Sequence, residues 1–481
     1  MRERLLLLAG AAAAFGASLG SGFHFDDYDI FADPTLGSAG GWIQVWAPRQ
    51  TRPLTFFTFW LNRQLGGGDA LGYHLFNLVF HLAAVALAYE CLRRLVTPRA
   101  AFIGAAVFAI HPIQAEAVNY VWARGIVLAS LLCLAALWYW IEGRPWLAVL
   151  WFLLALLAKE EVAAFPLLLA WLDWRESAPR ARRRWLPVAA MLALSLCAGA
   201  RVVWATMVTP GAPAGLQAGI SPLQYLLVQG GSLLRYLQLL LFPYGFSVDP
   251  RVSTALWPSL GAWVIVLGAL VLVMLYAPRG IATWIAGGML LLLPSSSIFP
   301  AADLAVDRRM YLPMFAFAAA AGLALEHVRP APVLAVLGVM LAGVSLERTI
   351  VWQSDRALWR EAMERAPGKV RPKIQLARAL PAAEALELLN RARLDAPNDP
   401  VIAAEIGKTL LSEGQADAAL EEFGRALALD PSNARYMNDR GVALAALGQT
   451  EAARADFVRA LYFDPSLREA RDNLNKLPAP Q

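Results

Sequence analysis

The chain has 481 residues, of which 58% are hydrophobic and 16% charged, and its formal net charge is +5. Soluble domains carry about 25% charged residues, so this composition excludes an ordinary soluble enzyme, and the high hydrophobic content excludes an intrinsically disordered chain. Charged residues are sparse as far as about residue 346 and dense beyond it. The sequence therefore predicts an all-α protein with a polytopic membrane helix bundle over 1–347 and a soluble domain over 348–481.

Apolar segments fill the first domain. A helix that crosses a bilayer needs about 20 mostly apolar residues. Eleven segments are predicted as spans: 4–20, 71–92, 99–114, 125–141, 146–158, 162–174, 185–205, 257–277, 280–294, 310–326 and 331–347. On composition alone the first could also be a cleaved signal sequence. Cys91, Cys133 and Cys197 lie in these segments and are expected to be buried without forming disulfides.

Arginines cluster between the apolar segments, which indicates membrane topology rather than a nucleic-acid surface. Basic residues mark the cytoplasmic side. One orientation places inside Arg2, Arg4, Arg93, Arg94, Arg99, Arg144, Arg175, Arg180, Arg182, Arg183, Arg184, Arg279 and Arg329. This orientation requires that 222–244, which carries Gln229, Arg235 and Gln238, lies in the outer interface or is re-entrant. The N-terminus is then inside and the C-terminal domain outside.

The first predicted outer loop contains two adjacent acidic residues, Asp26 and Asp27. Acidic residues this close to a membrane helix are costly unless they line a polar cavity. They indicate either a metal site or a general base directed at an acceptor hydroxyl. The alternative is the ordinary acidity of a solvated loop. His74 could complete a metal site with them, although the ligand spacing is not diagnostic.

A polar stripe follows at the start of the second span. His74, Asn77 and His81 are spaced so that they share one helix face. Polar side chains aligned inside an apolar span usually face the interior of the bundle. We expect them to form hydrogen bonds between helices in preference to contacting a substrate.

Five cations fall on the predicted outer side, where basic residues should be depleted. They are Arg52, Arg124, Lys159, Arg308 and Arg309. Arg and Lys pair well with phosphate oxygens, so this group suggests a site for a phosphate attached to a lipid. For any single cation the alternative is a snorkelling anchor, or an internal salt bridge such as Lys159 with Glu160.

The soluble domain contains an internal repeat. When 400–433 is aligned on 434–467, Gly407 matches Gly441, and every matching pair is 34 residues apart. This is the period of tetratricopeptide repeats. A degenerate unit precedes these two, and 352–367 is expected to form the second helix of a further pair. Such arrays usually bind a protein partner; the alternative is a solubilising spacer.

The order of the motifs adds to these observations. FDDYDI, TRPLTFFTFWLN, GYHLFNLVFHL, HPIQAEAVNYVWAR, LAKEE and DRRMYLP precede the repeats. Together they resemble the transmembrane-and-tetratricopeptide-repeat O-mannosyltransferase family, which belongs to the GT-C superfamily of integral-membrane glycosyltransferases. The resemblance implies that the first segment is a retained span and that Asp26 or Asp27 is the catalytic carboxylate. It implies that the donor phosphate binds Arg52, Arg124, Lys159, Arg308 and Arg309. Substrate-binding or supporting roles are expected for His74, Asn77, His111, Glu116, Glu160 and Tyr311.

The resemblance implies transfer of a sugar from a polyprenyl-phosphate monosaccharide to a hydroxyl of a protein or glycan on the extracytoplasmic face. It leaves open whether a divalent cation such as Mg²⁺ or Mn²⁺ assists. The Ala- and Arg-rich composition suggests a bacterial inner-membrane protein with its repeats in the periplasm. One alternative is a ligase or polymerase that uses a lipid pyrophosphate-linked oligosaccharide, which would not require the acidic pair. The other is a non-enzymatic scaffold, which leaves the acidic pair and the outer cations unexplained.

Overall fold

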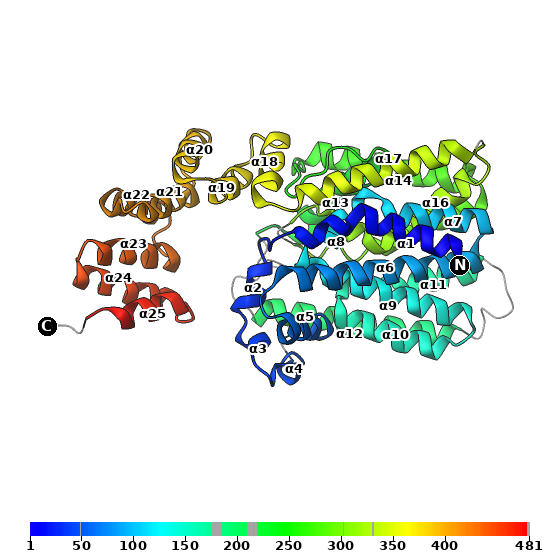
Figure 1. The fold of residues 1–481 in the computed structure, drawn as a ribbon, viewed down its shortest axis with the longest axis horizontal. Helices are drawn as coiled ribbons and strands as arrows, with labels where there is room; N and C mark the ends of the chain where they lie inside the picture. The colour runs from blue at the N-terminus through cyan, green and yellow to red at the C-terminus, as the bar shows by residue number, and fades with distance from the viewer. Residues whose placement is uncertain are drawn as a thin grey trace. The chain divides into compact units, whose positions relative to one another are not determined.

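The computed structural model describes residues 1–48, 50–175, 184–208, 215, 219–301, 303–329 and 331–478. Over these residues the chain is helical and contains no β-strand. It divides into two compact units, Met1–Ser354 and Asp355–Gln481 (Figure 1). The predicted all-α fold, with a membrane helix bundle followed by repeats, is confirmed. The predicted domain boundary at 347/348 lies inside the last helix of the first unit.

The helices of the first unit run side by side, and the short helices α2 to α5 gather at one end of the bundle (Figure 1). In chain order the elements are α1 (Arg2–Phe15), η1 (Gly16–Gly20), α2 (Asp27–Ala32), α3 (Pro34–Gly37), α4 (Gly41–Gln44), α5 (Pro53–Gly66), α6 (Ala70–Leu95), α7 (Pro98–Ile110), η2 (Pro112–Gln114), α8 (Ala115–Asn119), η3 (Val121–Ala123), α9 (Arg124–Ile141), α10 (Pro145–Ala158), η4 (Glu160–Val162), α11 (Phe165–Arg175), α12 (Trp185–Val208), α13 (Pro222–Leu241), α14 (Leu256–Tyr276), α15 (Arg279–Leu291), η7 (Asp307–Met310), α16 (Tyr311–Leu325) and α17 (Ala331–Val351).

Each of the eleven segments predicted as spans contains a helix. Among the described residues, six helices are long and apolar enough to cross a membrane, or seven if α7 and the following bent segment form one broken span. The chain is thus a multi-pass membrane protein, and the other predicted spans are shorter helices. Cys91 and Cys133 are buried as expected, but the expectation for Cys197 is wrong because that residue is exposed. It lies on α12, which buries only Pro187 and Met191 and so packs on one side.

The predicted inside arginines lie at one end of the bundle, where helix ends contact one another. The contacts are Arg4 with Glu90, Arg94 with Glu142, Arg99 with the carbonyl of Val328, and Arg175 with Thr283. This is the end opposite α2 to α5 (Figure 1). Arg180, Arg182 and Arg183 of the predicted set lie outside the described residues. The arrangement is the one that the predicted orientation requires, while the side that faces the cytoplasm stays a prediction.

Helix α13 is not one of the six described helices that are long and apolar enough to cross a membrane. Its polar side chains instead hold the loop that precedes α16. The Gln229 amide and the Ser232 hydroxyl both donate to the carbonyl of Leu304, at 3.2 and 3.0 Å. Arg235 forms an ion pair with Asp307. Helix α13 therefore fixes the segment that carries Arg308.

Small residues let α7 and α16 approach closely, as is common where membrane helices pack. A Cβ added to Gly104 would lie 2.7 Å from the carbonyl oxygen of Ala318. Helix α7 leads into η2 and α8, and α16 follows η7 directly. The close packing of these two helices therefore sets the spacing between Glu116 on α8 and Arg308 on η7.

The second unit consists of α18 (Asp355–Arg365), α19 (Val370–Arg378), α20 (Ala382–Asp395), α21 (Pro400–Ser412), α22 (Ala416–Leu429), α23 (Ala434–Ala446), α24 (Thr450–Phe463) and α25 (Arg468–Lys476). Helices α20, α22 and α24 each have 14 residues. Their first residues are 34 positions apart, so the predicted repeat is confirmed. The prediction of a repeat helix from residue 352 is wrong at its start, because α18 begins at Asp355 and Trp352 belongs to the first unit.

The repeats pack through glycine and phenylalanine residues that recur at the same spacing in each repeat: Gly407 faces Phe423, and Gly441 faces Phe457. A Cβ on Gly407 would lie 2.7 Å from the ring of Phe423, which is fully buried. We expect Gly407→Ala to lower the free energy of unfolding of the repeat unit by about 1–3 kcal/mol through overpacking. Gly424→Ala is the control, because nothing lies within 4 Å of its added Cβ, and it should raise stability by about 0.5–1 kcal/mol. Limited proteolysis of the full chain measures both, and equal cleavage rates would contradict the packing explanation.

Candidate functional site

The structure separates the roles of the two acidic residues at the start of α2. Asp27 is fully buried, and its carboxylate accepts hydrogen bonds from the backbone N–H groups of His24 and Trp122, at 3.0 and 2.7 Å. Burial raises the pKa of Asp27 to about 7. Asp26 is exposed, and its carboxylate accepts a 3.0 Å hydrogen bond from the hydroxyl of Tyr120. Asp27 thus ties the loop to η3, whereas Asp26 is accessible to a substrate.

Aromatic side chains surround the turn before Asp26. Phe25 has φ +42°, the single positive φ of a non-glycine residue among those described. Such strain persists only where the surroundings over-determine the conformation. Here Trp352 stacks on Tyr120 with ring centroids 5.7 Å apart, Phe25 packs edge-on against both rings, and the His24 ring lies 2.6 Å from the Trp352 carbonyl oxygen. These contacts hold Asp26 in place from the end of α17.

Arg308 lies on the other side of Tyr120. Its guanidinium sits over the Tyr120 ring, 5.8 Å from the centroid, and forms ion pairs with Glu116 and, at 3.6 Å, with Asp303. Glu116 also accepts the backbone N–H groups of Asp307 and Arg308, at 2.6 and 3.2 Å. Burial acts to lower the pKa of Arg308, but the Glu116 and Asp303 carboxylates outweigh it and hold that pKa above its ordinary value. The supporting role predicted for Glu116 is therefore to fix Arg308.

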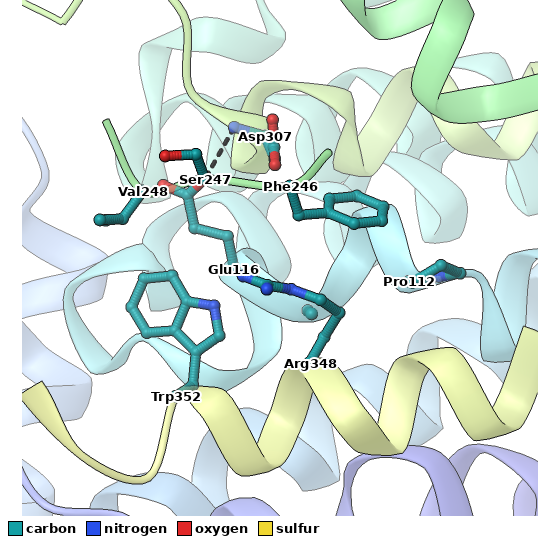
Figure 2. Close-up of a pocket in the computed structure, with 9 residues that line it drawn as sticks. Pro112, Glu116, Phe246, Ser247, Val248, Asp307, Arg348 and Trp352 are labelled. Atoms are coloured by element: carbon teal, nitrogen blue, oxygen red, sulfur yellow. Dashed lines mark hydrogen bonds between the residues drawn. The ribbon is translucent and has the colours of Figure 1, made fainter. Parts of the chain in front are cut away.

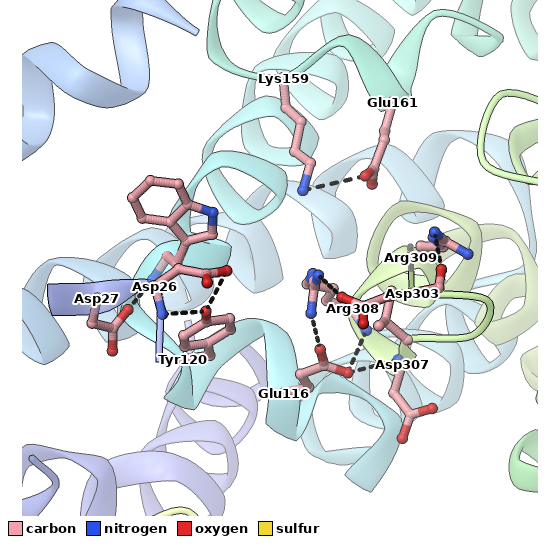
Figure 3. Close-up of polar contacts among 12 residues, drawn as sticks. Asp26, Asp27, Glu116, Tyr120, Lys159, Glu161, Asp303, Asp307, Arg308 and Arg309 are labelled. Carbon is pink, nitrogen blue, oxygen red and sulfur yellow. Dashed lines mark hydrogen bonds and ion pairs between the residues drawn. The ribbon is translucent and has the colours of Figure 1, made fainter. Parts of the chain in front are cut away.

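A second group of charges comes from the end of α10 and the start of α5. Arg52 and Glu160 form a two-point ion pair, with N–O distances of 2.6 and 3.1 Å. The ammonium of Lys159 lies 3.4 Å from Glu161 and is nearly buried, and burial lowers its pKa to about 8. Figure 3 shows the Asp26 carboxylate, the Arg308 guanidinium and the Lys159 ammonium directed toward one region. A carboxylate and cations from distant chain segments are thus brought together.

Arg309 points to the far side of Arg308 from Asp26 in Figure 3. Its guanidinium donates to the carbonyl oxygens of Leu304 and Asp303, at 3.1 and 2.9 Å. These bonds brace the loop before η7. Arg309 thus supports the position of Arg308 instead of facing the region between Asp26 and Lys159.

Arg124, which was predicted to bind the donor phosphate, lies inside the helix bundle. Its side chain is fully buried and donates to the Asn77 side chain at 2.8 Å and to the carbonyls of Tyr73 and Thr58, at 2.9 and 3.2 Å. Its guanidinium also lies 4.6 Å from the centroid of the Phe59 ring. A cation enclosed in this way joins α5, α6 and α9 and cannot reach a phosphate from outside.

The remaining predicted residues connect helices and loops. The His74 ring lies 3.0 Å from the carbonyl oxygen of Gly22, and the Asn77 amide donates to the Tyr120 carbonyl at 3.1 Å. His81 and the Tyr311 hydroxyl lie 2.8 Å apart. His111 lies 3.3 Å from the carbonyl oxygen of Leu240 and accepts from the Ile113 backbone N–H. The polar stripe on α6 thus makes the hydrogen bonds between elements that were expected.

A small pocket adjoins the Glu116 end of this cluster (Figure 2). It is lined by Pro112, Ala115, Glu116, Phe246, Ser247, Val248, Asp307, Arg348 and Trp352. Its volume of about 10 Å³ is close to the minimum that holds one water molecule. This pocket is therefore too small to hold anything larger than a water molecule.

Two contributors were missed in the sequence. Tyr120 lies within the HPIQAEAVNYVWAR motif, and this position was the one feature of the sequence that could have marked it as a site residue. The sequence predicts Trp352 as the first residue of a repeat helix, whereas the structure places it in the first unit, stacked on Tyr120. Among the described residues, no three His, Cys, Asp or Glu side chains lie close enough together to hold a metal ion, so the proposed set of His74 with Asp26 and Asp27 is not assembled.

Comparison with known proteins gives matches in both units. The C-terminal unit matches the TPR repeat family over residues 407–448 and the tetratricopeptide repeat family over 434–467. A protein O-mannosyl-transferase of Caenorhabditis elegans is 29% identical over 181 residues, which cover 34% of this chain and 26% of that protein. A protein O-mannosyl-transferase of Mus musculus is 34% identical over 149 residues, covering 28% and 16%.

Among solved structures, ArnT from Cupriavidus metallidurans bound to undecaprenyl phosphate aligns over 94% of this chain and 79% of that chain, with 13% identity and a TM-score of 0.43. The matches to the worm and mouse proteins span about a quarter of their length or less. Over part of its length, the chain is thus similar to protein O-mannosyl-transferases, and its C-terminal unit carries tetratricopeptide repeats.

Proposed function

We propose that this chain is an integral-membrane glycosyltransferase that transfers a hexose, by analogy with its relatives a mannose, from a polyprenyl phosphate to a Ser or Thr hydroxyl. The observation that carries the proposal is the placement of Asp26 and Arg308 on either side of Tyr120 (Figure 3). A base for the acceptor and a cation for the phosphate are the two groups that this reaction needs. The partial similarity to protein O-mannosyl-transferases supports the same reaction class.

In the proposed mechanism the donor phosphate binds Arg308, Lys159 and Arg52. A guanidinium has five N–H donors, so Arg308 can retain Glu116 and still donate to a phosphate oxygen. Asp26 takes the proton of the acceptor hydroxyl, whose oxygen attacks the anomeric carbon in line and inverts it. The bond from that carbon to the phosphate oxygen breaks, and the lipid phosphate leaves as an anion stabilised by Arg308.

The proposed reaction takes place on the side of the membrane where α2 to α5 lie, which we assign to the periplasm of a bacterium. The repeats follow α17 and are proposed to recruit the protein acceptor or a partner that delivers it. Tetratricopeptide arrays offer extended concave faces suited to peptides.

Reconstitution tests the proposal. The purified chain in nanodiscs is mixed with polyprenyl-phosphate mannose and a Ser/Thr-rich peptide, and the peptide mass is measured. A gain of one hexose is expected. Transfer from a lipid pyrophosphate-linked oligosaccharide alone would favour the ligase alternative, and no transfer from either donor would favour the scaffold.

Tyr120→Phe removes the hydrogen bond that orients the Asp26 carboxylate. A hydrogen bond to a charged group contributes roughly 1.5–3 kcal/mol, so kcat should fall by about 10- to 100-fold. The phenylalanine ring keeps the packing against Trp352 and Arg308, so KM for the donor should stay unchanged. Steady-state kinetics with varied donor give both constants. A rise in KM without a fall in kcat would show that Tyr120 acts on donor binding instead of on Asp26.

A further inference from the structure

A second pocket lies at the arginine-rich end of the bundle, where α6 and α11 end and α15 begins. It is lined by Leu95, Leu172, Trp174, Arg175, Arg279, Gly280, Thr283 and Trp284. Its volume of about 500 Å³ falls within the range of roughly 300–1,000 Å³ that is typical of small-molecule sites. None of the residues that give the proposed transferase site its charge lines this pocket.

The charged residues that line the pocket are all basic. Two of its lining residues are arginines and none is acidic. In the described part of the chain no carboxylate lies within ion-pair distance of Arg175 or Arg279, whereas Arg94 at the same end of the bundle pairs with Glu142 at 2.7 Å. Over the residues that the structure describes, the pocket therefore presents positive charge without an acidic partner, and an anion would complement it.

Arg175 is also held in a defined position. Its guanidinium donates to the Thr283 hydroxyl at 2.9 Å and to the Arg279 carbonyl at 3.3 Å, and it packs 5.4 Å from the centroid of the Trp171 ring. Thr283 in turn donates to the Arg279 carbonyl at 2.7 Å. These neutral partners fix the side chain without cancelling its charge, as a preorganised anion site requires.

The remaining walls are apolar. Leu95 and Leu172 line the pocket beside the two arginines, and Trp174 is two-thirds exposed at the end of α11. Tryptophan is enriched where membrane helices meet the headgroup region. A cationic pocket with an aliphatic wall at this depth matches the phosphate and first acyl carbons of a membrane lipid, whereas a free phosphate ion would not use that wall.

We propose that this pocket binds the phosphate headgroup of an anionic phospholipid, with Arg175 and Arg279 contacting the phosphate. The proposal does not depend on the transferase activity, because its readout is lipid binding. Each arginine near an anionic lipid surface contributes about 1 kcal/mol, so loss of one is expected to weaken binding about fivefold.

The test uses the full chain, delipidated in detergent and titrated with phosphatidylglycerol, phosphatidylcholine or inorganic phosphate, with bound lipid counted by native mass spectrometry. Phosphatidylglycerol should be retained in preference to phosphatidylcholine. Arg279→Gln should weaken its retention about fivefold, and the double change with Arg175→Gln should weaken it further. Arg144→Gln is the control, since Arg144 is a basic residue that does not line the pocket.

Arg279→Gln keeps the test decisive if Arg175→Gln misfolds, because no hydrogen bond or ion pair of the Arg279 side chain is found in the described part of the chain. Equal retention by Arg279→Gln and the wild type would overturn the site. Equal retention of both lipids would overturn the requirement for an anionic headgroup. Protection of the fold by inorganic phosphate alone, with no bound lipid, would show a free-anion site and overturn the lipid assignment.

Discussion

Replacing Asp26 by asparagine is expected to lower the rate of sugar transfer by about 10²- to 10⁴-fold, the range typical for loss of a general base. Asparagine keeps an oxygen that accepts the Tyr120 hydroxyl, so the loop should retain its geometry. The amide cannot take a proton from the acceptor alcohol, so the loss should fall on kcat. Transfer of hexose to a peptide by the purified variant in nanodiscs measures this effect.

Asp27→Asn should behave differently. Its two carboxylate oxygens accept separate backbone N–H groups in a buried position, and an amide nitrogen cannot accept a hydrogen bond. One buried N–H is then unsatisfied at a cost of about 1–3 kcal/mol, so this variant should lose folded protein before it loses kcat. Asp29→Asn, an exposed change on the same helix, is the control and should keep wild-type activity. Full activity of Asp26→Asn, or equal losses in all three, would remove Asp26 from the mechanism.

The helices of the membrane unit could be predicted because a long apolar segment has few alternatives to a helix in a bilayer. The same reasoning could not settle how many of these helices cross the membrane. Helices such as α10, with 14 residues, and α11, with 11, are apolar but short, and only their packing decides how they cross. The repeats were predictable for another reason. Gly407 and Gly441 each accommodate a phenylalanine ring, so the 34-residue spacing of these glycines follows from how the helices of each repeat pack.

The site was predictable as a set of segments but not as a set of side chains. Arg124 and Arg308 both stand beside apolar helices, and nothing local to either distinguishes them. Arg124 is enclosed because Asn77 and the Tyr73 carbonyl lie around it, whereas Arg308 is turned toward Tyr120 because Glu116 accepts its N–H groups. Such partners are distant in sequence, and one chain without relatives aligned to it does not reveal them.

Arg308→Gln is expected to lower kcat by about 10²- to 10³-fold, the loss usual when a group that stabilises developing negative charge is removed. The single variant has a second consequence, because it leaves Glu116 buried without its ion-pair partner, and such a change costs about 3–5 kcal/mol. Reduced activity could then reflect a damaged fold.

The double variant Glu116→Gln/Arg308→Gln separates these effects. It removes both charges together, and the glutamine oxygen at 116 can still accept the backbone N–H of Asp307, which the wild type holds at 2.6 Å. The double variant should therefore be as thermally stable as the wild type while it still transfers sugar 10²- to 10³-fold more slowly, a rate loss expected for a missing charge-stabilising group.

Glu116→Gln alone, which retains Arg308 and its contact with Asp303, should keep most of the activity. Recovery of the wild-type rate in the double variant would mean that Arg308 serves only to neutralise Glu116, and the donor phosphate would then have to bind Lys159 and Arg52 without it.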